Sequence, residues 1–148
     1  MSVKTRLQDD MKQALRSGDR ARLSVVRMAL AAIQQREVDE RKELDDAELL
    51  GVIEKLVKQR QESVEQYRQG GRDDLADKEA AEIEVLKAYL PEPLSEEALS
   101  ALIDEAVAST GADSMKDMGR VMGFIKSRAA GRVDMSVISA RVKARFQG

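Results

Sequence analysis

Only two prolines occur in this 148-residue chain, and both lie in the segment PEPLSEE, at Pro91 and Pro93. Proline interrupts a helix and restricts the residue before it to extended conformations. Because both prolines fall in one short segment, the chain is stiff and extended there, and no other segment has this proline restriction. We therefore predict a domain boundary at this point, with one domain over residues 1–92 and another over residues 93–148.

Apolar residues recur at helical spacing on both sides of the proline segment, and no stretch alternates as a β-strand would. Capping residues and glycines divide this pattern into four helices before the prolines and three after them. The chain is 35% charged and only 3% aromatic, which also favours salt-laced helices over sheets. We predict an all-α protein, with an N-terminal four-helix bundle followed by a C-terminal three-helix bundle.

Short polar residues mark where most of the predicted helices begin. The expected N-caps are Ser2, Asp19, Asp45 or Asp46, Ser95, Ser114 (with Asp117 as a capping box) and Asp134. Glycines at positions 18, 70, 111 and 131 end or turn the helices that precede them, and the fourth helix is expected over about residues 72–90. The first helix is expected to bury Leu15 with Val3, Leu7, Met11 and Ala14.

Two charged residues fall within apolar stripes of the predicted first bundle. Arg60 lies in the stripe of the third helix and Glu79 in that of the fourth. Because a charge in such a position is usually paired or extends outward, we expect Arg60 to meet Glu79 or Glu82.

The chain lacks cysteine and histidine, which excludes disulfides, thiolate metal sites and the most common general base. The acids of GRDD, Asp73 and Asp74, could hold Mg²⁺, but two acids at a helix start are also what the helix dipole favours. We predict no catalytic residue, no metal site and no cofactor. The N-terminus lacks the apolar core of a signal peptide and no apolar run spans a bilayer, so we expect a cytoplasmic protein without membrane contact.

The C-terminal end has a different charge balance from the rest of the chain. From Met115 onward there are eight basic and two acidic residues, whereas the preceding part has 17 basic and 25 acidic residues. A basic segment on an acidic protein indicates a polyanion or an acidic partner. We therefore expect the C-terminal domain to be a basic tail.

Four residues of the predicted sixth helix share one face: Lys116, Gly119, Gly123 and Lys126. We call them the lysine–glycine strip. Each glycine inside a helix lowers helix stability by up to about 1 kcal/mol relative to alanine, so we expect a compensating interaction at the exposed backbone. One interpretation is close approach of a phosphate backbone whose charge the lysines neutralise. The other is close approach of a second helix, with the lysines merely solvated.

Further basic residues surround the strip in sequence, on its helix, in the next turn and on the last helix. With only four aromatic residues in the chain, base stacking is poorly supplied, and contact would be to phosphate and shape rather than to sequence. A membrane surface is a weaker alternative because the tail lacks an aromatic belt. The candidate RNA-binding residues are Lys116, Gly119, Arg120, Gly123, Lys126, Arg128, Gly131, Arg132, Arg141 and Arg145.

Several segments together resemble the YqeY family across essentially the whole chain: RLSVVRM at 22–28, GRDDL at 71–75, EIEVLKAYLPEPLSEEAL at 82–99, and DMGRVMGFI followed by GRVD. That family resembles the C-terminal helical and tail portion of GatB, a subunit of the glutamine-dependent amidotransferase that amidates misacylated tRNA. The resemblance implies a four-helix part followed by a three-helix part, and a tail that holds tRNA. The residues matching the tail motif are Gly119, Arg120, Val121, Met122, Gly123, Lys126, Gly131 and Arg132.

The resemblance does not bring GatB's kinase-like catalytic portion or a glutaminase. The chain also departs from the family after GRVD, where Met135-Ser136 stands in place of the frequent Gly-Ser. This change either removes a glycine used in close RNA approach or only extends the last helix.

We therefore expect a non-catalytic module that binds tRNA or another structured RNA. Two alternatives remain at this point. One is an accessory component of a glutamine-dependent tRNA amidotransferase, a carbon–nitrogen ligase, with the other amidotransferase subunits as partners. The other is a protein-interaction module whose glycines pack against a partner helix.

Overall fold

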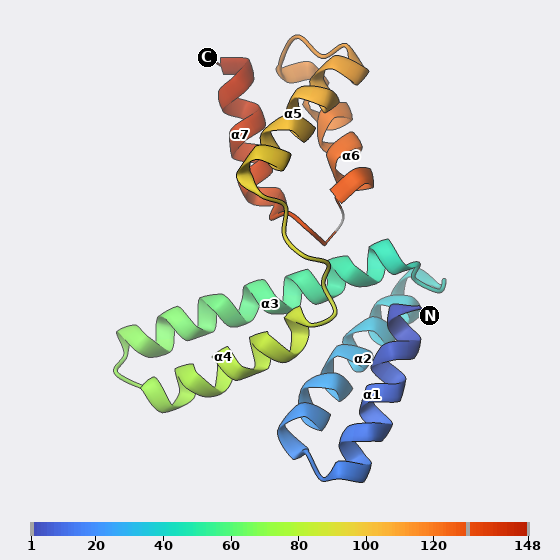
Figure 1. The fold of residues 1–148 in the computed structure, drawn as a ribbon, viewed down its shortest axis with the longest axis vertical. Helices are drawn as coiled ribbons and strands as arrows, with labels where there is room; N and C mark the ends of the chain where they lie inside the picture. The colour runs from blue at the N-terminus through green and yellow to red at the C-terminus, as the bar shows by residue number, and fades with distance from the viewer. Residues whose placement is uncertain (1, 130, 148) are drawn as a thin grey trace. The chain divides into compact units, whose positions relative to one another are not determined.

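The computed structural model describes residues 2–129 and 131–147, and every regular element in these ranges is helical. The all-α prediction is confirmed. The chain divides into two compact units, residues 1–90 and 91–148, and the division falls beside Pro91 (Figure 1). The N-terminal unit contains α1 (Val3–Ser17), α2 (Arg20–Glu40), α3 (Asp46–Gln69) and α4 (Asp73–Lys87). The C-terminal unit contains α5 (Glu96–Thr110), the 3₁₀ turn η1 (Met115–Asp117), α6 (Met118–Ala129) and α7 (Met135–Gln147).

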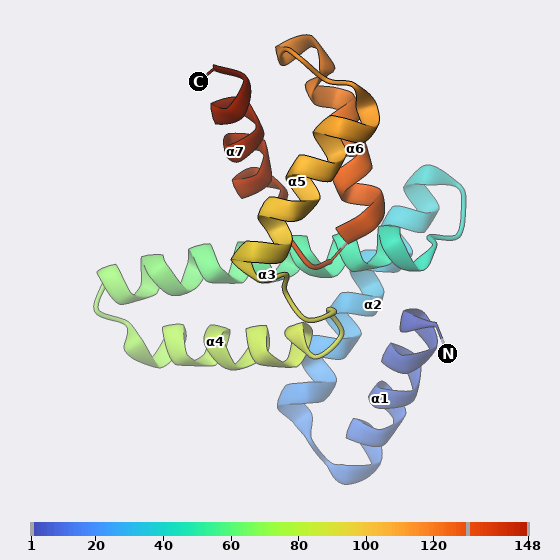
Figure 2. The same cartoon turned by 45° about the horizontal axis from the view of Figure 1, so that its top comes forward.

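The N-terminal unit is built from two helical hairpins, α1–α2 and α3–α4, that cross one another (Figure 2). Helix α2 packs against both α3 and α4, and α1 packs against α3. The core between the hairpins is apolar, and its fully buried side chains include Leu7, Val26, Ile33, Ile53 and Leu86.

Most of the predicted helix starts are confirmed by hydrogen bonds. The side chains of Ser2, Asp19 and Ser95 each accept from a backbone N–H three residues later, and Asp45 forms a complete capping box with Glu48. These bonds satisfy N–H groups that have no partner within the helix. Gly18 ends α1 and Gly111 ends α5, both in the left-handed conformation that favours glycine.

Two details of the first unit differ from the predictions. Leu15 is 60% exposed, because α1 buries Val3, Leu7 and Ala14 and presents Leu15 to the side of that stripe. Helix α4 ends at Lys87 instead of continuing to Leu90. The N–H groups of Tyr89 and Leu90 instead donate to carbonyls three residues earlier, as in a turn that leads into the proline segment.

The predicted Arg60 pair is confirmed. Arg60 Nε donates to Glu82 Oε2 at 3.1 Å, and Glu79 Oε2 lies 4.0 Å away. Only 12% of the Arg60 side chain is exposed, so this charge is held between α3 and α4 in a largely desolvated position.

The C-terminal unit has its own apolar core between α5, α6 and α7. Ile103, Val121, Ile125, Ile138 and Val142 are all buried there. The segment after the prolines is fixed to the turn before α7, since Leu94 N–H donates to the Arg132 carbonyl at 3.1 Å.

The start of the sixth helix was predicted wrongly. Ser114 makes no capping bond with its side chain, and η1 precedes α6 in place of a capping box. The Asp117 carboxylate instead accepts from the Asp113 N–H at 3.2 Å and from the Arg120 guanidinium. It therefore ties the loop before the helix to the helix itself. The last helix begins as predicted, with Asp134 accepting from the Ser136 N–H at 2.9 Å.

Candidate nucleic-acid interface

The lysine–glycine strip lies on the outer face of η1 and α6. At about 100° per residue, Gly119 and Gly123 point away from the buried side chains of Val121 and Ile125. All four strip residues are solvent-exposed. The sequence pattern therefore identified a true surface of the folded unit.

The two glycines are not needed for packing inside the chain. A Cβ added at Gly119 or at Gly123 would meet no atom within 4 Å. Neither glycine has positive φ, so neither is required by backbone conformation. Since no described part of the chain packs against them, helix packing explains the bare backbone only if the helix belongs to another molecule.

The lysines of the strip are free to meet an external anion. Lys116 and Lys126 form no ion pair or hydrogen bond with the residues that the structure describes. Lys143 on α7 is likewise exposed and without such a partner in the described ranges.

The arginines of this unit behave differently, because acids of α5 hold three of them. Arg128 Nη1 donates to Glu105 at 3.1 Å, and Arg145 donates to Asp104. Arg141 donates to Glu96 at 2.9 Å. Its second nitrogen reaches the hydroxyl of Ser100 at 3.0 Å.

The α5 partners of the α7 arginines form a regular ridge. Glu96, Ser100 and Asp104 recur every four residues, so they lie one above another on a single face of α5. Arg141 and Arg145 have the same spacing on α7 and are directed at this ridge, not at the lysine–glycine strip. The structure therefore does not bring all the predicted RNA-binding residues together.

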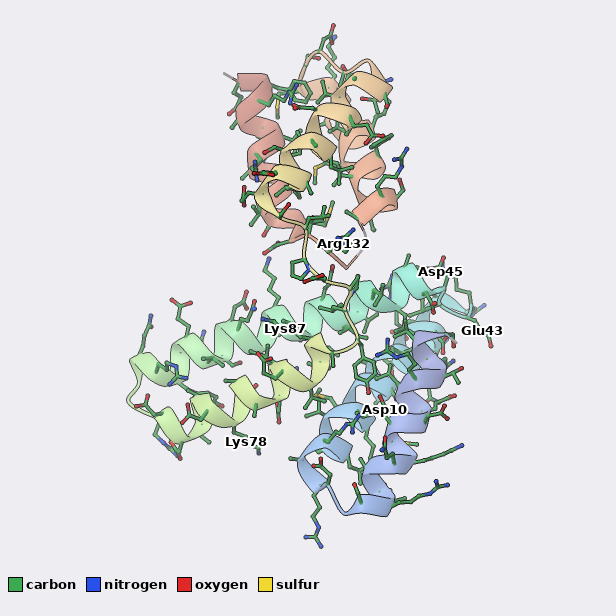
Figure 3. The ribbon with its side chains drawn as sticks, in the orientation of Figure 1. Asp10, Glu43, Asp45, Lys78, Lys87 and Arg132 are labelled. Carbon is green, nitrogen blue, oxygen red and sulfur yellow. The ribbon has the colours of Figure 1, made fainter. Side chains whose placement is uncertain are left out.

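Arg120 and Arg132 have partners of other kinds. Arg120 pairs with Asp117 and donates to the Thr110 carbonyl at 3.1 Å. Hydrogen bonds from Arg120 and from the Asp113 backbone lower the pKa of Asp117 to about 2. Arg132, in the turn between α6 and α7 (Figure 3), donates to the Glu92 carbonyl at 2.8 Å, and no acid among the described residues pairs with its positive charge.

The basic surplus counted from Met115 does not extend to the whole C-terminal unit. The predicted domain, residues 93–148, holds eight basic and seven acidic residues, because it includes the acidic helix α5. In the fold, three of the arginines pair with acids that come 23 to 45 positions earlier.

Base stacking finds no free ring here either. The guanidinium of Arg128 covers the Phe124 ring at 4.8 Å from its centroid, and Phe124 is partly buried in the core. Gly131, which has φ 79°, supplies the left-handed conformation for the turn before α7. The engaged Phe124 ring makes base stacking at this surface unfavourable, so any nucleic-acid contact would be to the backbone.

No cluster of three or more potential metal ligands occurs in the described ranges. The acids of GRDD have cationic partners, since Asp73 lies 3.6 Å from Arg68 and Asp74 lies 3.1 Å from Arg72. No helix in the part of the chain that the structure covers is long and apolar enough to cross a membrane.

Comparison with known proteins places this fold in a family. A model of the Yqey-like proteins matches residues 4–146, which includes both units and the whole lysine–glycine strip. The chain belongs to the YqeY family. This match is what the sequence segments at 22–28, 71–75 and 82–99 indicated.

Three fungal proteins are similar in sequence to this chain, two of them over most of its length. A Lachancea thermotolerans protein is 30% identical over 148 residues, covering 95% of this chain and 79% of its own. A Pyrenophora tritici-repentis protein is 31% identical with the same coverage, and an Eremothecium gossypii protein is 39% identical over 57% of this chain and 46% of its own. Each is named "Altered inheritance of mitochondria protein 41, mitochondrial". That name states a phenotype and a location for those proteins, and no ligand.

Proposed function

We propose that this YqeY protein is a non-catalytic module that binds the sugar–phosphate backbone of a structured RNA of the tRNA class. The observation that carries the proposal is the lysine–glycine strip. Two helical glycines face open space, and the exposed lysines on either side make no bond with the described residues. No contact within the described chain compensates for the helix stability lost at these glycines.

A phosphate backbone suits this surface for steric and electrostatic reasons. The missing side chains at Gly119 and Gly123 allow a ligand strand to approach the helix closely, and the lysines supply positive charge at the ends of that approach. In the described part of the C-terminal unit both aromatic rings are engaged, since Arg128 covers Phe124, and Phe124 and Phe146 are partly buried in the core. Recognition would therefore depend on RNA shape and charge.

Only some of the basic residues of the tail are available for the proposed RNA contact. Acids pair with Arg120, Arg128, Arg141 and Arg145. The cations left for contact are the two lysines of the strip, Arg132 and Lys143. A plot of log affinity against log salt concentration should then have a slope of at most about −4, of which the two strip lysines account for about −2. If all eight cations of the tail contacted phosphate, the slope would be about −7.

The test is tRNA binding to the full chain across a salt series. Lys116→Glu with Lys126→Glu should weaken binding at low salt by about tenfold or more and remove about half of the salt dependence. The matched control is Arg27→Glu with Lys55→Glu, which makes the same charge change at exposed positions of the N-terminal unit. No binding at low salt, or an equal loss in both double variants, would reject the proposal.

Large side chains introduced at the two glycines of the strip provide a second test, which does not change the charge. Gly119→Leu with Gly123→Leu should weaken RNA binding by obstructing close approach, while Ala140→Leu with Ala144→Leu adds similar bulk at exposed positions of α7 as a control. A protein-interaction module predicts a different result. The glycine variant would abolish association with a partner helix, and that association would be barely salt-sensitive.

The role as an accessory amidotransferase component depends on the resemblance of the YqeY family to GatB. A pull-down with the full chain from its source cells distinguishes the two cases, since recovery of a glutaminase-type subunit supports the accessory role and recovery of tRNA alone supports the RNA-binding module. The cytoplasmic location stays a prediction. A mitochondrial location is the alternative that the relatives' names suggest, and cell fractionation with immunoblotting separates the two.

A further inference from the structure

A surface groove runs between α2 and α4 in the N-terminal unit, with a volume of about 340 Å³. Four apolar side chains line it, two from each helix: Ala21, Val25, Ala81 and Val85. The remaining lining residues are Arg20, Ser24, Lys78 and Glu82. Most of these residues are solvent-exposed, so the groove is an open surface feature and not an enclosed cavity.

The groove carries two cations that have no partner in the described residues, Arg20 on α2 and Lys78 on α4. Figure 3 labels Lys78 on α4. The one acid that lines the groove, Glu82, is held by Arg60 at 3.1 Å. The groove is therefore apolar along its walls and positively charged.

Other acids near these cations in sequence are also engaged. The Asp19 carboxylate caps α2 by accepting from the Arg22 N–H at 3.1 Å. Before Lys78, Asp74 pairs with Arg72, and Asp77 pairs with Arg68 at 3.2 Å. No carboxylate of the described chain forms an ion pair with Arg20 or Lys78, so both cations are available to an external anion.

We propose that this groove docks an amphipathic, acidic helix of a partner protein. An apolar side chain of that helix would enter between Ala21 and Ala81, and carboxylates beside it would meet Arg20 and Lys78. Small side chains on both walls leave room for such an insertion.

The walls of the groove explain why the occupant is a helix. Both walls are α-helices, so they offer no row of free backbone groups, as a strand edge would, for an added strand to pair with. The Ser24 hydroxyl in the groove could form only a few hydrogen bonds with the backbone of a bound segment. A partner segment must therefore satisfy its own backbone, which a helix does. A small molecule would be left largely exposed in an open groove, whereas small-molecule sites usually enclose most of their ligand.

Selection from a displayed library of amphipathic helices tests the occupant directly. The library fixes leucines at helical spacing and varies the flanking positions among Glu, Lys and Gln. The bait is the full chain, with counter-selection against Ala81→Trp, which fills the groove from an exposed position. We expect enrichment of Glu at the flanking positions. Failure to enrich any clone over the filled variant, or enrichment of Lys, would overturn the proposal.

Affinity of an enriched peptide then tests the two cations. Arg20→Glu with Lys78→Glu should weaken binding by about tenfold or more, because two attractions become repulsions. Arg27→Glu with Lys55→Glu should change it by less than about twofold. Equal losses in both pairs would contradict the assigned charges. Ser24→Trp provides a second groove-filling variant on the other wall, so the test does not depend on the folding of Ala81→Trp alone.

The same variants separate a partner helix from a second copy of the chain. If sedimentation shows a dimer that Ala81→Trp and Ser24→Trp both dissociate, the groove serves self-association and the partner-helix proposal is wrong. The groove and the lysine–glycine strip lie in different units, so loss of peptide binding with retained tRNA binding, or the reverse, distinguishes failure of one proposal from failure of the other.

Discussion

One arginine ion pair in each unit shows how burial changes the effect of such a pair. In the N-terminal unit Arg60 is 12% exposed and joins α3 to two glutamates of α4. In the C-terminal unit Arg145 is 41% exposed and its partner Asp104 is 67% exposed. Because water competes for the second pair and hardly for the first, the first contributes to stability and the second mainly cancels charge. Similar ion pairs therefore have different consequences in the two units.

The largest expected effect concerns Arg60. Arg60→Ala leaves Glu82 partly buried without its cation and should lower the free energy of unfolding by about 2 kcal/mol, below the range for fully buried pairs because some solvent reaches this one. Urea denaturation measures the change. Arg145→Ala, at an exposed position of the C-terminal unit, should cost no more than about 0.5 kcal/mol. Similar losses in the two variants would remove the contrast between the units.

The next effect concerns the helical glycines. Gly119→Ala and Gly123→Ala should each raise the free energy of unfolding by up to about 1 kcal/mol, because the new methyl group meets nothing and alanine favours the helix. Gly18→Ala should do the opposite, since Gly18 has φ 74°. Thermal unfolding followed by circular dichroism checks both. A destabilised Gly123→Ala protein would show that the strip packs against something in the folded chain.

A smaller change in stability but a clear change in binding is expected for the α5 ridge. Glu96→Gln with Asp104→Asn should cost no more than about 1 kcal/mol in total, because both pairs are exposed. Freed from these acids, Arg141 and Arg145 become available to phosphate. Affinity for tRNA at low salt should rise, and the salt slope should steepen by up to about two. An unchanged slope would indicate that these arginines lie beyond reach of the RNA.

The smallest expected effect is a pH dependence at the start of α6. The pKa of Asp117 is lowered to about 2 from its ordinary value of 3.8. Its ionised form therefore stabilises the fold above pH 3.8, and that stabilisation is lost as the pH falls from about 4 to 2. Thermal melts over this pH range should show a steeper loss for the wild type than for Asp117→Asn. Parallel curves would assign no role to this carboxylate.

Local features of the fold were predictable from the sequence. Caps such as Ser2 and Asp19 act within one helical turn, so the residue and its partner are visible together in the sequence. The Arg60 pair was also predictable, because a charge within an apolar stripe requires a partner from the facing stripe. Position 114 was the exception among the caps, since Asp117 is used by Arg120 and by the preceding loop.

Features that depend on how helices meet could not be predicted. No local pattern indicated that Glu96 and Asp104 would pair with arginines 41 to 45 positions away. The groove between α2 and α4 was missed for the same reason. Ala21 and Ala81 are ordinary helix residues until the packing of their two helices makes them line one groove. The lysine–glycine strip could be predicted because its four residues lie close together in the sequence, on η1 and α6.

The acidic ridge of α5 also determines what a shortened protein would do. A fragment that begins at Met115 keeps eight basic and two acidic residues and loses every α5 carboxylate. Such a peptide would be a polycation that adheres to any nucleic acid, and its apparent affinity would greatly exceed that of the intact unit. Proteolytic cleavage in the loop that follows Gly111 would have the same result in a cell extract, if α6 and α7 separated from α5. Helix α5 thus offsets much of the positive charge that α6 and α7 would carry alone.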